Sequence, residues 1–224
     1  MGEAIGAILA PAVGVALSPL PIIGVILILF SPRARTLGPL FAFGWVLAMS
    51  IVIALVLIFA DPANLEDDAD DPSTASAIIH LVLGLVLLFL AFKQWQGRPK
   101  EGETPEMPKW MQTIDKVSPP VALGLGALLS GLNPKNLILT LGAATSIAQA
   151  NLSTGQDIVV ALIFIVIASI SVAGAVIWYL VAGERATATL TEVKDWMTVH
   201  NSVVMAVLLL LLGVSFVGKG IGGF

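Results

Sequence analysis

Long apolar stretches dominate this chain and limit what it can fold into. Residues 37–60, LGPLFAFGWVLAMSIVIALVLIFA, contain no charged side chain, and several other stretches are nearly as apolar. A stretch of roughly 20 apolar residues is long enough to cross a bilayer as a helix. Only 12% of the 224 residues are charged, and the mean hydropathy is +0.97. The sequence therefore predicts an all-α integral membrane protein.

The hydropathy pattern predicts six transmembrane helices. Nine of the eleven basic residues lie in the three connections that follow the first, third and fifth of them. Because loops rich in Lys and Arg stay in the cytoplasm, we expect both termini to lie outside it. The predicted helices cover residues 4–30, 37–60, 76–93, 121–148, 157–182 and 201–218.

Three connections carry recognisable patterns. Residues 61–71 are strongly acidic and are interpreted as a solvated external connector, with divalent cation binding as the alternative. Residues 107–117 and 190–197 place apolar side chains at helical spacing. These two segments predict short amphipathic helices at the membrane surface, which serve as anchors or, alternatively, as a substrate gate or a face for a partner.

A proline follows a small polar residue at matching places in the first and fourth predicted helices. The two motifs are ALSPLPII and GLNPKNLIL, 115 residues apart. A chain with three helices in each half re-enters the membrane from the opposite side. The sequence thus predicts two inverted three-helix repeats, residues 1–95 and 119–224, joined by a cytoplasmic linker over residues 96–118. Paired broken helices of this kind indicate a transporter's binding site.

The residues of the two motifs predict where new helices begin. Proline cannot donate a backbone hydrogen bond and pushes the preceding residue out of helical geometry, whereas Ser and Asn favour the N-cap. Two half-helix N-termini, with partial positive charge and free N–H groups, would then face each other near the bilayer centre. A lysine adds a full charge there. The predicted anion site consists of Ser18, Pro19, Pro21, Asn133, Pro134, Lys135 and Asn136. Simple kinks are the alternative interpretation.

Other residues are assigned weaker roles. Arg33 and Arg35 are candidates for contact with a headgroup at the cytoplasmic mouth, and otherwise are ordinary topology determinants. Hydroxyl side chains of the fourth and fifth helices are candidates for a polar path (Ser130, Thr140, Ser169 and Ser171). Four glycines predict close helix packing (Gly38, Gly44, Gly124 and Gly126).

The composition argues against several other functions. The chain has no cysteine and two histidines, His80 and His200, so it predicts no disulfide, no metal site and no cofactor. No set of residues suited to catalysis is evident, so an enzyme is not expected. The sequence has no basic run that would bind nucleic acid.

In these features the chain resembles the LysE-type exporter superfamily, and within it the actinobacterial glycolipid-addressing family, the sulfolipid-addressing (Sap-like) group. The stretches that carry the resemblance are ALSPLPIIGVILILFSPRAR, GLNPKNLIL and the hydrophilic connection between the third and fourth helices. The resemblance implies a protein of the bacterial plasma membrane that helps to move glycolipids or other lipid-linked envelope material outward. A branch of the superfamily that passes electrons through paired cysteines is excluded, because this chain has none.

Three functions follow as expectations. The first is a transporter or flippase that holds an anionic lipid headgroup between the broken helices, with Lys135 as counter-ion. The second is an exporter of a small polar solute such as an amino acid. The third is a non-transporting scaffold for envelope-lipid export. A homodimer or the export machinery are the expected protein partners.

Overall fold

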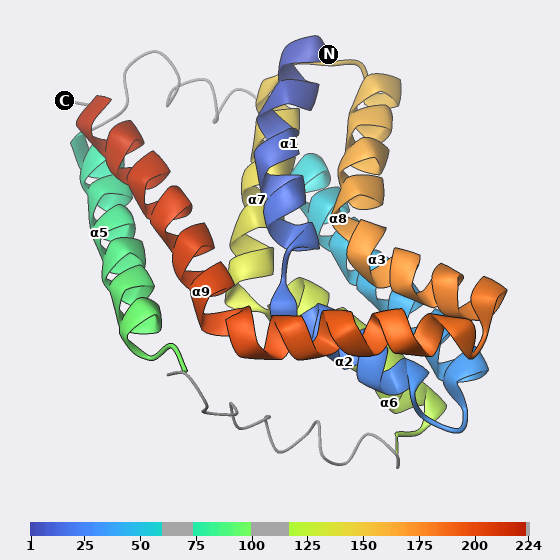
Figure 1. Ribbon diagram of the computed structural model, residues 1–224. Helices are drawn as coiled ribbons and strands as arrows, with labels where there is room; N and C mark the ends of the chain where they lie inside the picture. Colours follow the sequence, from blue (N-terminus) through green and yellow to red (C-terminus); the bar gives the residue numbers. More distant parts are fainter. Residues whose placement is uncertain (60–73, 100–116, 223–224) are drawn as a thin grey trace. The chain divides into compact units, whose positions relative to one another are not determined.

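Helices make up most of the chain where its structure is described. The computed structural model describes residues 1–59, 74–99 and 117–222, and these contain no strand. The predicted all-α class is therefore confirmed for this part of the chain. Figure 1 shows the helices α1 (Gly2–Ala16), α2 (Pro19–Leu29), α3 (Ala34–Phe59), α5 (Thr74–Gln96), α6 (Pro119–Ala127), α7 (Pro134–Gln149), α8 (Thr154–Ala182) and α9 (Arg185–Gly222), with a π-helical turn, η2 (Leu128–Leu132), between α6 and α7.

Several helices are long and apolar enough to cross a membrane. Among the described residues these are α3, α8 and α9, and the pair α1 and α2 makes a fourth span if the bent pair is counted as one. The chain is accordingly an integral membrane protein. The spans predicted at residues 76–93 and 121–148 correspond to α5 and to the series α6, η2 and α7, which are not among these four.

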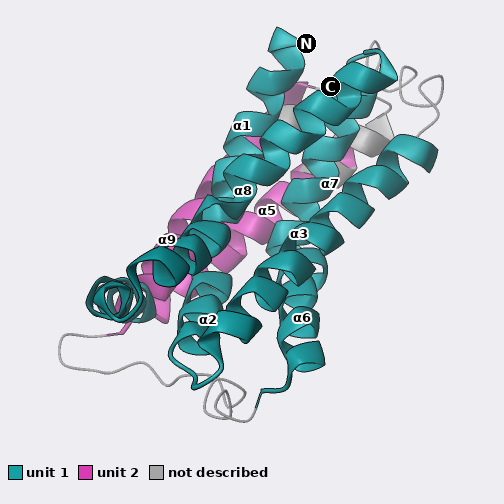
Figure 2. Ribbon diagram, turned by 90° about the vertical axis from the view of Figure 1, so that its right-hand side faces the viewer, with its two compact units in different colours: residues 1–60, 106–198 teal, residues 61–105, 199–224 magenta. Residues whose placement is uncertain are grey.

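The helices form two compact units, which Figure 2 colours separately. Unit 1 comprises Met1–Ala60 and Glu106–Thr198, and unit 2 comprises Asp61–Pro105 and Val199–Phe224. The units do not follow the two halves of the sequence. Unit 1 holds the helices of the first two predicted spans of each half, whereas unit 2 holds α5 and most of α9, which belong to the third span of each half.

Two glycines hold α3 and α6 together in unit 1. A Cβ atom at Gly44 would overlap the carbonyl of Leu123, and one at Gly126 would overlap the carbonyl of Phe41. The backbones therefore touch, as small residues allow in membrane proteins. Gly38 is also enclosed, since its Cβ would lie 2.7 Å from Leu29 Cδ2. The prediction fails at Gly124, where a Cβ would meet nothing within 4 Å.

Unit 2 contains a crossing of the same kind between α5 and α9. A Cβ at Gly84 would lie 2.7 Å from Val217 Cγ2, and a Cβ at Gly213 would lie 2.8 Å from Leu88. Gly84 and Gly213 are separated by the same sequence distance as Leu88 and Val217. The two contacts are therefore reciprocal, as they would be between two helices related by a two-fold axis.

The predicted amphipathic segments have different outcomes. The segment at residues 107–117 lies almost entirely outside the described residues, as does the acidic connector at 61–71. The segment at 190–197 is helical, but it is not a separate short helix. It belongs to the 38-residue α9, which continues without interruption into the predicted sixth span. The residues between this segment and the predicted sixth span include no proline or glycine that would end the helix.

Candidate functional site

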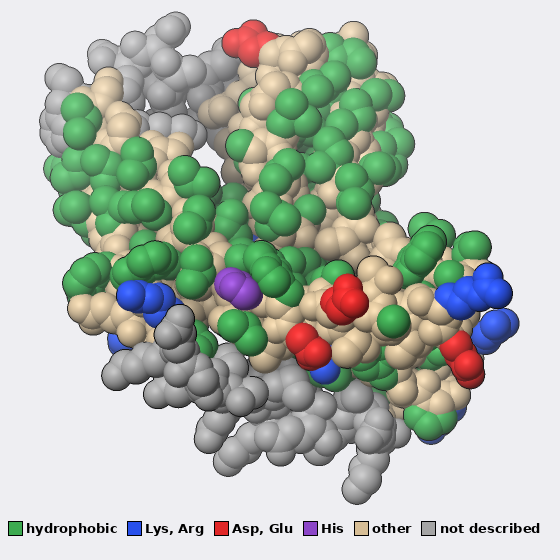
Figure 3. Space-filling view, in the orientation of Figure 1, with side chains coloured by type: hydrophobic (Ala, Val, Ile, Leu, Met, Phe, Trp, Pro, Cys, Tyr) green, Lys and Arg blue, Asp and Glu red, His purple; other side chains and the backbone are tan. Residues whose placement is uncertain are grey.

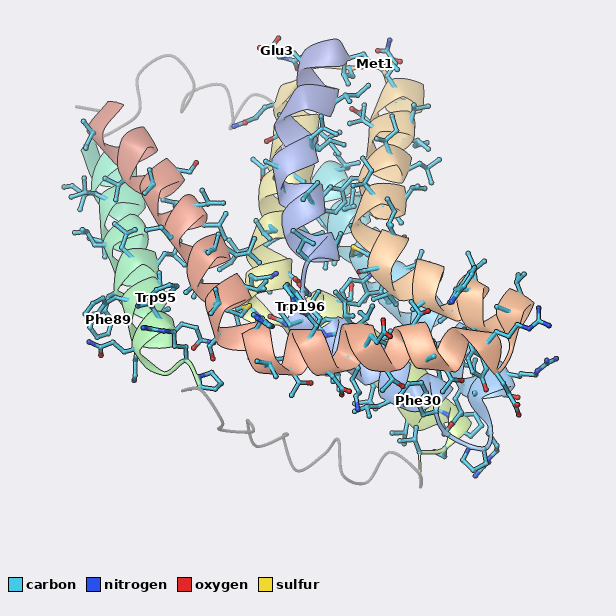
Figure 4. All side chains as sticks on the ribbon, in the orientation of Figure 1. Met1, Glu3, Phe30, Phe89, Trp95 and Trp196 are labelled. Carbon is cyan, nitrogen blue, oxygen red and sulfur yellow. The ribbon has the colours of Figure 1, made fainter. Side chains whose placement is uncertain are left out.

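The first predicted break is a bend between α1 and α2. Helix α1 ends at Ala16, α2 begins at Pro19, and their axes differ by 51°. Ser18 occupies the N-cap position with an extended backbone, and Pro19 takes the first helical position. This follows from proline chemistry, because Pro19 has no N–H with which to continue α1. Figure 4 labels Met1 and Glu3 at the free end of α1 and Phe30 just past the end of α2.

The second predicted break precedes α7. Asn133 is its N-cap, with an extended backbone, and its side chain accepts a hydrogen bond from the Lys135 N–H at 3.2 Å. Pro134 takes the first helical position. The five residues before Asn133 form the π-helical turn η2, which the sequence analysis did not predict. Such turns widen a helix locally and are frequent at functional sites.

The Lys135 side chain reaches from α7 to the end of α1. It is 8% exposed, and its Nζ donates to the Gly14 carbonyl at 2.7 Å. Gly14 lies in the last turn of α1, where carbonyls lack helical partners and the helix dipole is negative. Lys135 thus caps α1. A lysine ammonium has three donors, and Lys135 forms no salt bridge with any described residue.

Asn136 connects the two breaks. Its side chain is fully buried, its Oδ1 accepts from the Ser18 hydroxyl at 2.6 Å, and its Nδ2 donates to the Leu129 carbonyl at 2.9 Å. The Ser18 hydroxyl therefore does not cap α2, as the sequence analysis expected, but bonds across to the other half of the chain. We call Ser18, Lys135 and Asn136, with the carbonyls of Gly14 and Leu129, the break cluster.

The two carbonyls of the break cluster occupy equivalent positions. Gly14 and Leu129 each lie four residues before an N-cap, Ser18 and Asn133 respectively. In an unbroken helix each carbonyl would accept from the residue four places on. At the first break the Ser18 N–H bonds to Val15 instead. Two consecutive side chains of α7 thus each donate to one of these carbonyls. Lys135 donates to the carbonyl of Gly14, in the first half of the chain, and Asn136 donates to the carbonyl of Leu129, in the second half.

The breaks offer fewer backbone donors than expected. In α2 the first and third residues are prolines, and the Ile22 N–H bonds to the Ser18 carbonyl. In α7 the first residue is a proline, the Lys135 N–H bonds to Asn133 Oδ1, and the Leu137 N–H bonds to the Asn133 carbonyl. Each first turn therefore has at most one N–H for a ligand. The expected anion site would rely on helix dipoles and Lys135 instead.

The remaining predicted residues are divided between surface and interior. Arg33 and Arg35 are exposed at the junction of α2 and α3, away from the break cluster in sequence. Ser171 bonds to the Ala16 carbonyl at 2.6 Å, so it too caps α1. The other three hydroxyls proposed for a polar path are buried and have no hydrogen-bond partner among the described residues: Ser130, Thr140 and Ser169.

An apolar groove opens beside the first break. Its volume is about 400 Å³, and α1, α2, α8 and the first part of α9 supply its walls. Figure 3 shows hydrophobic side chains spread over all the helices in this view, with charged groups at helix ends and along the start of α9. The lining residues are Ala16, Leu17, Ile22, Ile26, Ser171, Gly174, Ala175, Trp178, Thr189, Leu190, Val193 and Met197.

Comparison with known proteins identifies the family. The model of the family described as "Sap, sulfolipid-1-addressing protein" matches residues 8–222, which include both breaks and the groove. The chain belongs to this family. The family predicted from the sequence is thereby confirmed, whereas membership of the wider LysE-type superfamily stays a prediction. Neither the curated proteins nor the solved structures gave a match.

Sequence reasoning missed several parts of the site. It did not assign roles to the Gly14 and Leu129 carbonyls, although their distance of four residues from each N-cap marks them as unpaired. It listed Ser171 only as part of a polar path. It gave no indication of the groove, because the lining comes from four helices that are distant in sequence. Only a tertiary structure brings them together.

Proposed function

We propose that this protein moves an anionic lipid-linked component of the cell envelope across the bacterial plasma membrane, with the headgroup bound at the break cluster. The family description refers to a sulfolipid, which has an anionic headgroup, and so agrees with this substrate class. The protein acts as a transporter or flippase and carries out no covalent chemistry. Membrane lipids, an export machinery or a second copy of the chain are its proposed partners.

The observation that carries the proposal is the positive charge of Lys135 at the break cluster, which forms no salt bridge with a carboxylate of the described residues. Lys135 is buried and lies in the first turn of α7, where the helix dipole is also positive. A charged side chain inside a membrane protein costs free energy unless it is paired, and it usually marks a functional site. The negative C-terminal end of the α1 dipole offsets only part of this positive charge. A sulfate or phosphate group of the substrate would supply the remaining negative charge.

We further propose that the breaks lie near the membrane centre in two inverted three-helix repeats. Three pairings support the repeat: α3 packs on α6, α1 packs on α8, and α5 and α9 cross reciprocally at Gly84 and Gly213. In an inverted repeat, α1 corresponds to α6 and α3 to α8, so the first two pairings are equivalent. Arg33 and Arg35 would then meet the headgroup at the cytoplasmic mouth.

The apolar groove favours a lipid over a small solute. A solute exporter needs a sealed polar vestibule, whereas the depression beside the first break is open and almost entirely apolar. A lipid can keep its chains among apolar side chains while only its headgroup reaches the break cluster. Export of an amino acid therefore remains the second candidate.

Headgroup charge provides the test of this proposal. The purified protein would be reconstituted into phosphatidylcholine liposomes with fluorescent phosphatidylglycerol or, separately, fluorescent phosphatidylcholine as probe. Flipping would be followed by chemical quenching of the outer leaflet. We expect faster flipping of the anionic probe than in protein-free liposomes, and little effect on the zwitterionic probe. No acceleration of the anionic probe, with the folded protein present, would contradict the proposal.

A further inference from the structure

We infer that the apolar groove beside the first break is an acyl-chain site, which holds one hydrocarbon chain of the lipid whose headgroup binds at the break cluster. This inference rests on the proposed function and adds the substrate's chain as a recognised part. The groove supplies the volume, the apolar walls and the position that such a site requires.

The chemistry of the walls selects hydrocarbon. Ten of the twelve lining residues are apolar or glycine, and the two exceptions are Ser171 and Thr189. The Ser171 hydroxyl already donates its hydrogen bond to the Ala16 carbonyl, so it does not need a polar group of the bound molecule as an acceptor. Such a lining offers water few hydrogen-bond partners, and an ordered water needs several. In a membrane, the material available to fill the hollow is an acyl chain.

The position of the groove connects it to the break cluster. Ala16 and Leu17 line the groove and directly precede Ser18. The Gly14 carbonyl, which receives Lys135, lies in the same last turn of α1 as Ala16. Two residues of the groove lining therefore lie within about one helical turn of the Gly14 carbonyl that receives Lys135, or ~5 Å along the α1 axis. A single lipid can bind both with adjacent parts of its structure.

The first part of α9 gives the groove a distinct wall. Leu190, Val193 and Met197 face the groove at helical spacing, and charged residues occupy the positions between them (Glu192, Lys194 and Asp195). An amphipathic helix of this pattern lies at the boundary between water and hydrocarbon. The groove therefore lies between the end of α1 and this boundary segment. This gives the segment a role in substrate binding, beyond membrane anchoring.

Gly174 allows a test that leaves the fold intact. It lines the groove, is exposed, and a Cβ added there would meet nothing within 4 Å. Gly174→Trp would direct an indole into the groove from a backbone position where the added Cβ meets no neighbour. Gly142 in α7 is the matched control, because it is also helical, exposed and unobstructed, and it does not line the groove.

The experiment uses liposomes with two fluorescent phosphatidylglycerol probes that share a headgroup and differ in chain length. We expect Gly174→Trp to slow flipping of the long-chain probe roughly tenfold, which corresponds to ~1.4 kcal/mol, and to leave the short-chain probe at the wild-type rate. Gly142→Trp should change neither rate. Wild-type rates for both probes in Gly174→Trp, or equal slowing of both, would overturn the acyl-chain site. If the wild-type protein flips neither probe, the proposed function itself fails.

A second measurement excludes misfolding as the cause. The natural chain has no cysteine, so Gly174→Cys creates a unique thiol that can be modified after folding. An alkyl methanethiosulfonate would attach a hydrocarbon chain at this thiol. We expect slower flipping of the long-chain probe after modification, recovery after reduction, and no response in Gly142→Cys. Unchanged flipping after complete modification would overturn the inference.

Discussion

The two helix breaks begin with the same backbone chemistry but are held in place differently. At the first break, side chains of the second half bond to the end of α1: Lys135 to Gly14 and Ser171 to Ala16. At the second break, α6 is held by direct backbone contact with α3 at Gly126. The first break thus depends on polar bonds from α7 and α8, whereas the second combines one polar bond, from Asn136 to the Leu129 carbonyl, with the close packing of α6 on α3.

This difference indicates where the chain can change state. Hydrogen bonds between side chains and carbonyls in membrane proteins are weak individually and can exchange partners. Backbone contact through glycine has no such alternative. We therefore expect the first break to be the part that responds to a bound anion, because its cap, Lys135, is also the charge that would attract the anion. The second break serves as the fixed side of the site.

The largest expected effect on stability is at the backbone contact between α3 and α6. Gly126→Ala would place a methyl group against the Phe41 carbonyl and force α3 and α6 apart. We expect the free energy of unfolding to fall by about 3 kcal/mol, because overpacking against a rigid backbone cannot relax. Gly124→Ala, two residues earlier in α6, meets open space and should be neutral or stabilising by up to about 1 kcal/mol. Detergent-induced unfolding would measure both, and equal losses would contradict the packing argument.

A smaller effect is expected where the two breaks meet. Asn136→Leu would leave the Ser18 hydroxyl and the Leu129 carbonyl without partners in the interior. We expect a loss of about 2 kcal/mol in the free energy of unfolding. Asn133→Ala removes only a cap on the Lys135 N–H and should cost about 1 kcal/mol. If Asn133→Ala cost as much as Asn136→Leu, the bridging role of Asn136 would be wrong.

The smallest effect is expected at the polar end of α1. Ser171→Ala would remove the bond to the Ala16 carbonyl, at a cost of about 0.6 kcal/mol, typical of hydrogen bonds between membrane helices. Ser146→Ala is the control, because that hydroxyl bonds within its own helix, and it should have less effect. Hydrogen exchange of the amides at the end of α1 would provide the more sensitive measurement. Unchanged exchange in Ser171→Ala would argue against this cap.

Local chemistry explains which parts of the fold could be predicted. The starts of α2 and α7 were predicted correctly because a polar residue followed by proline determines a helix start without tertiary information. The π-helical turn η2 was missed because the apolar pattern of residues 128–132 is equally compatible with an α-helix. The length of α9 was missed because a change in hydrophobicity was interpreted as an end of the helix, although no breaker is present.

Long-range geometry explains the remainder of the site. The sequence placed Lys135 at a break, but its partner in α1 lies 121 residues away and is a backbone carbonyl. No pattern of side chains can reveal such a partner. The same applies to the difference between Gly124 and Gly126, which depends on the face of α6 that meets α3. Composition and spacing therefore predicted where the two helix breaks lie, but they could not predict which groups contact each other there.

The central claim concerns the charge of Lys135, and it is tested by comparing Lys135→Met with Lys194→Met in the liposome assay. Lys194 lies on α9 in a salt bridge with Asp195, so its substitution controls for loss of a positive charge. We expect Lys135→Met to fold, because an apolar side chain of similar length avoids the cost of a buried charge. It should flip the anionic probe at least about tenfold more slowly than wild type, while Lys194→Met remains near wild type. Equal flipping rates in folded Lys135→Met and wild type would contradict the account.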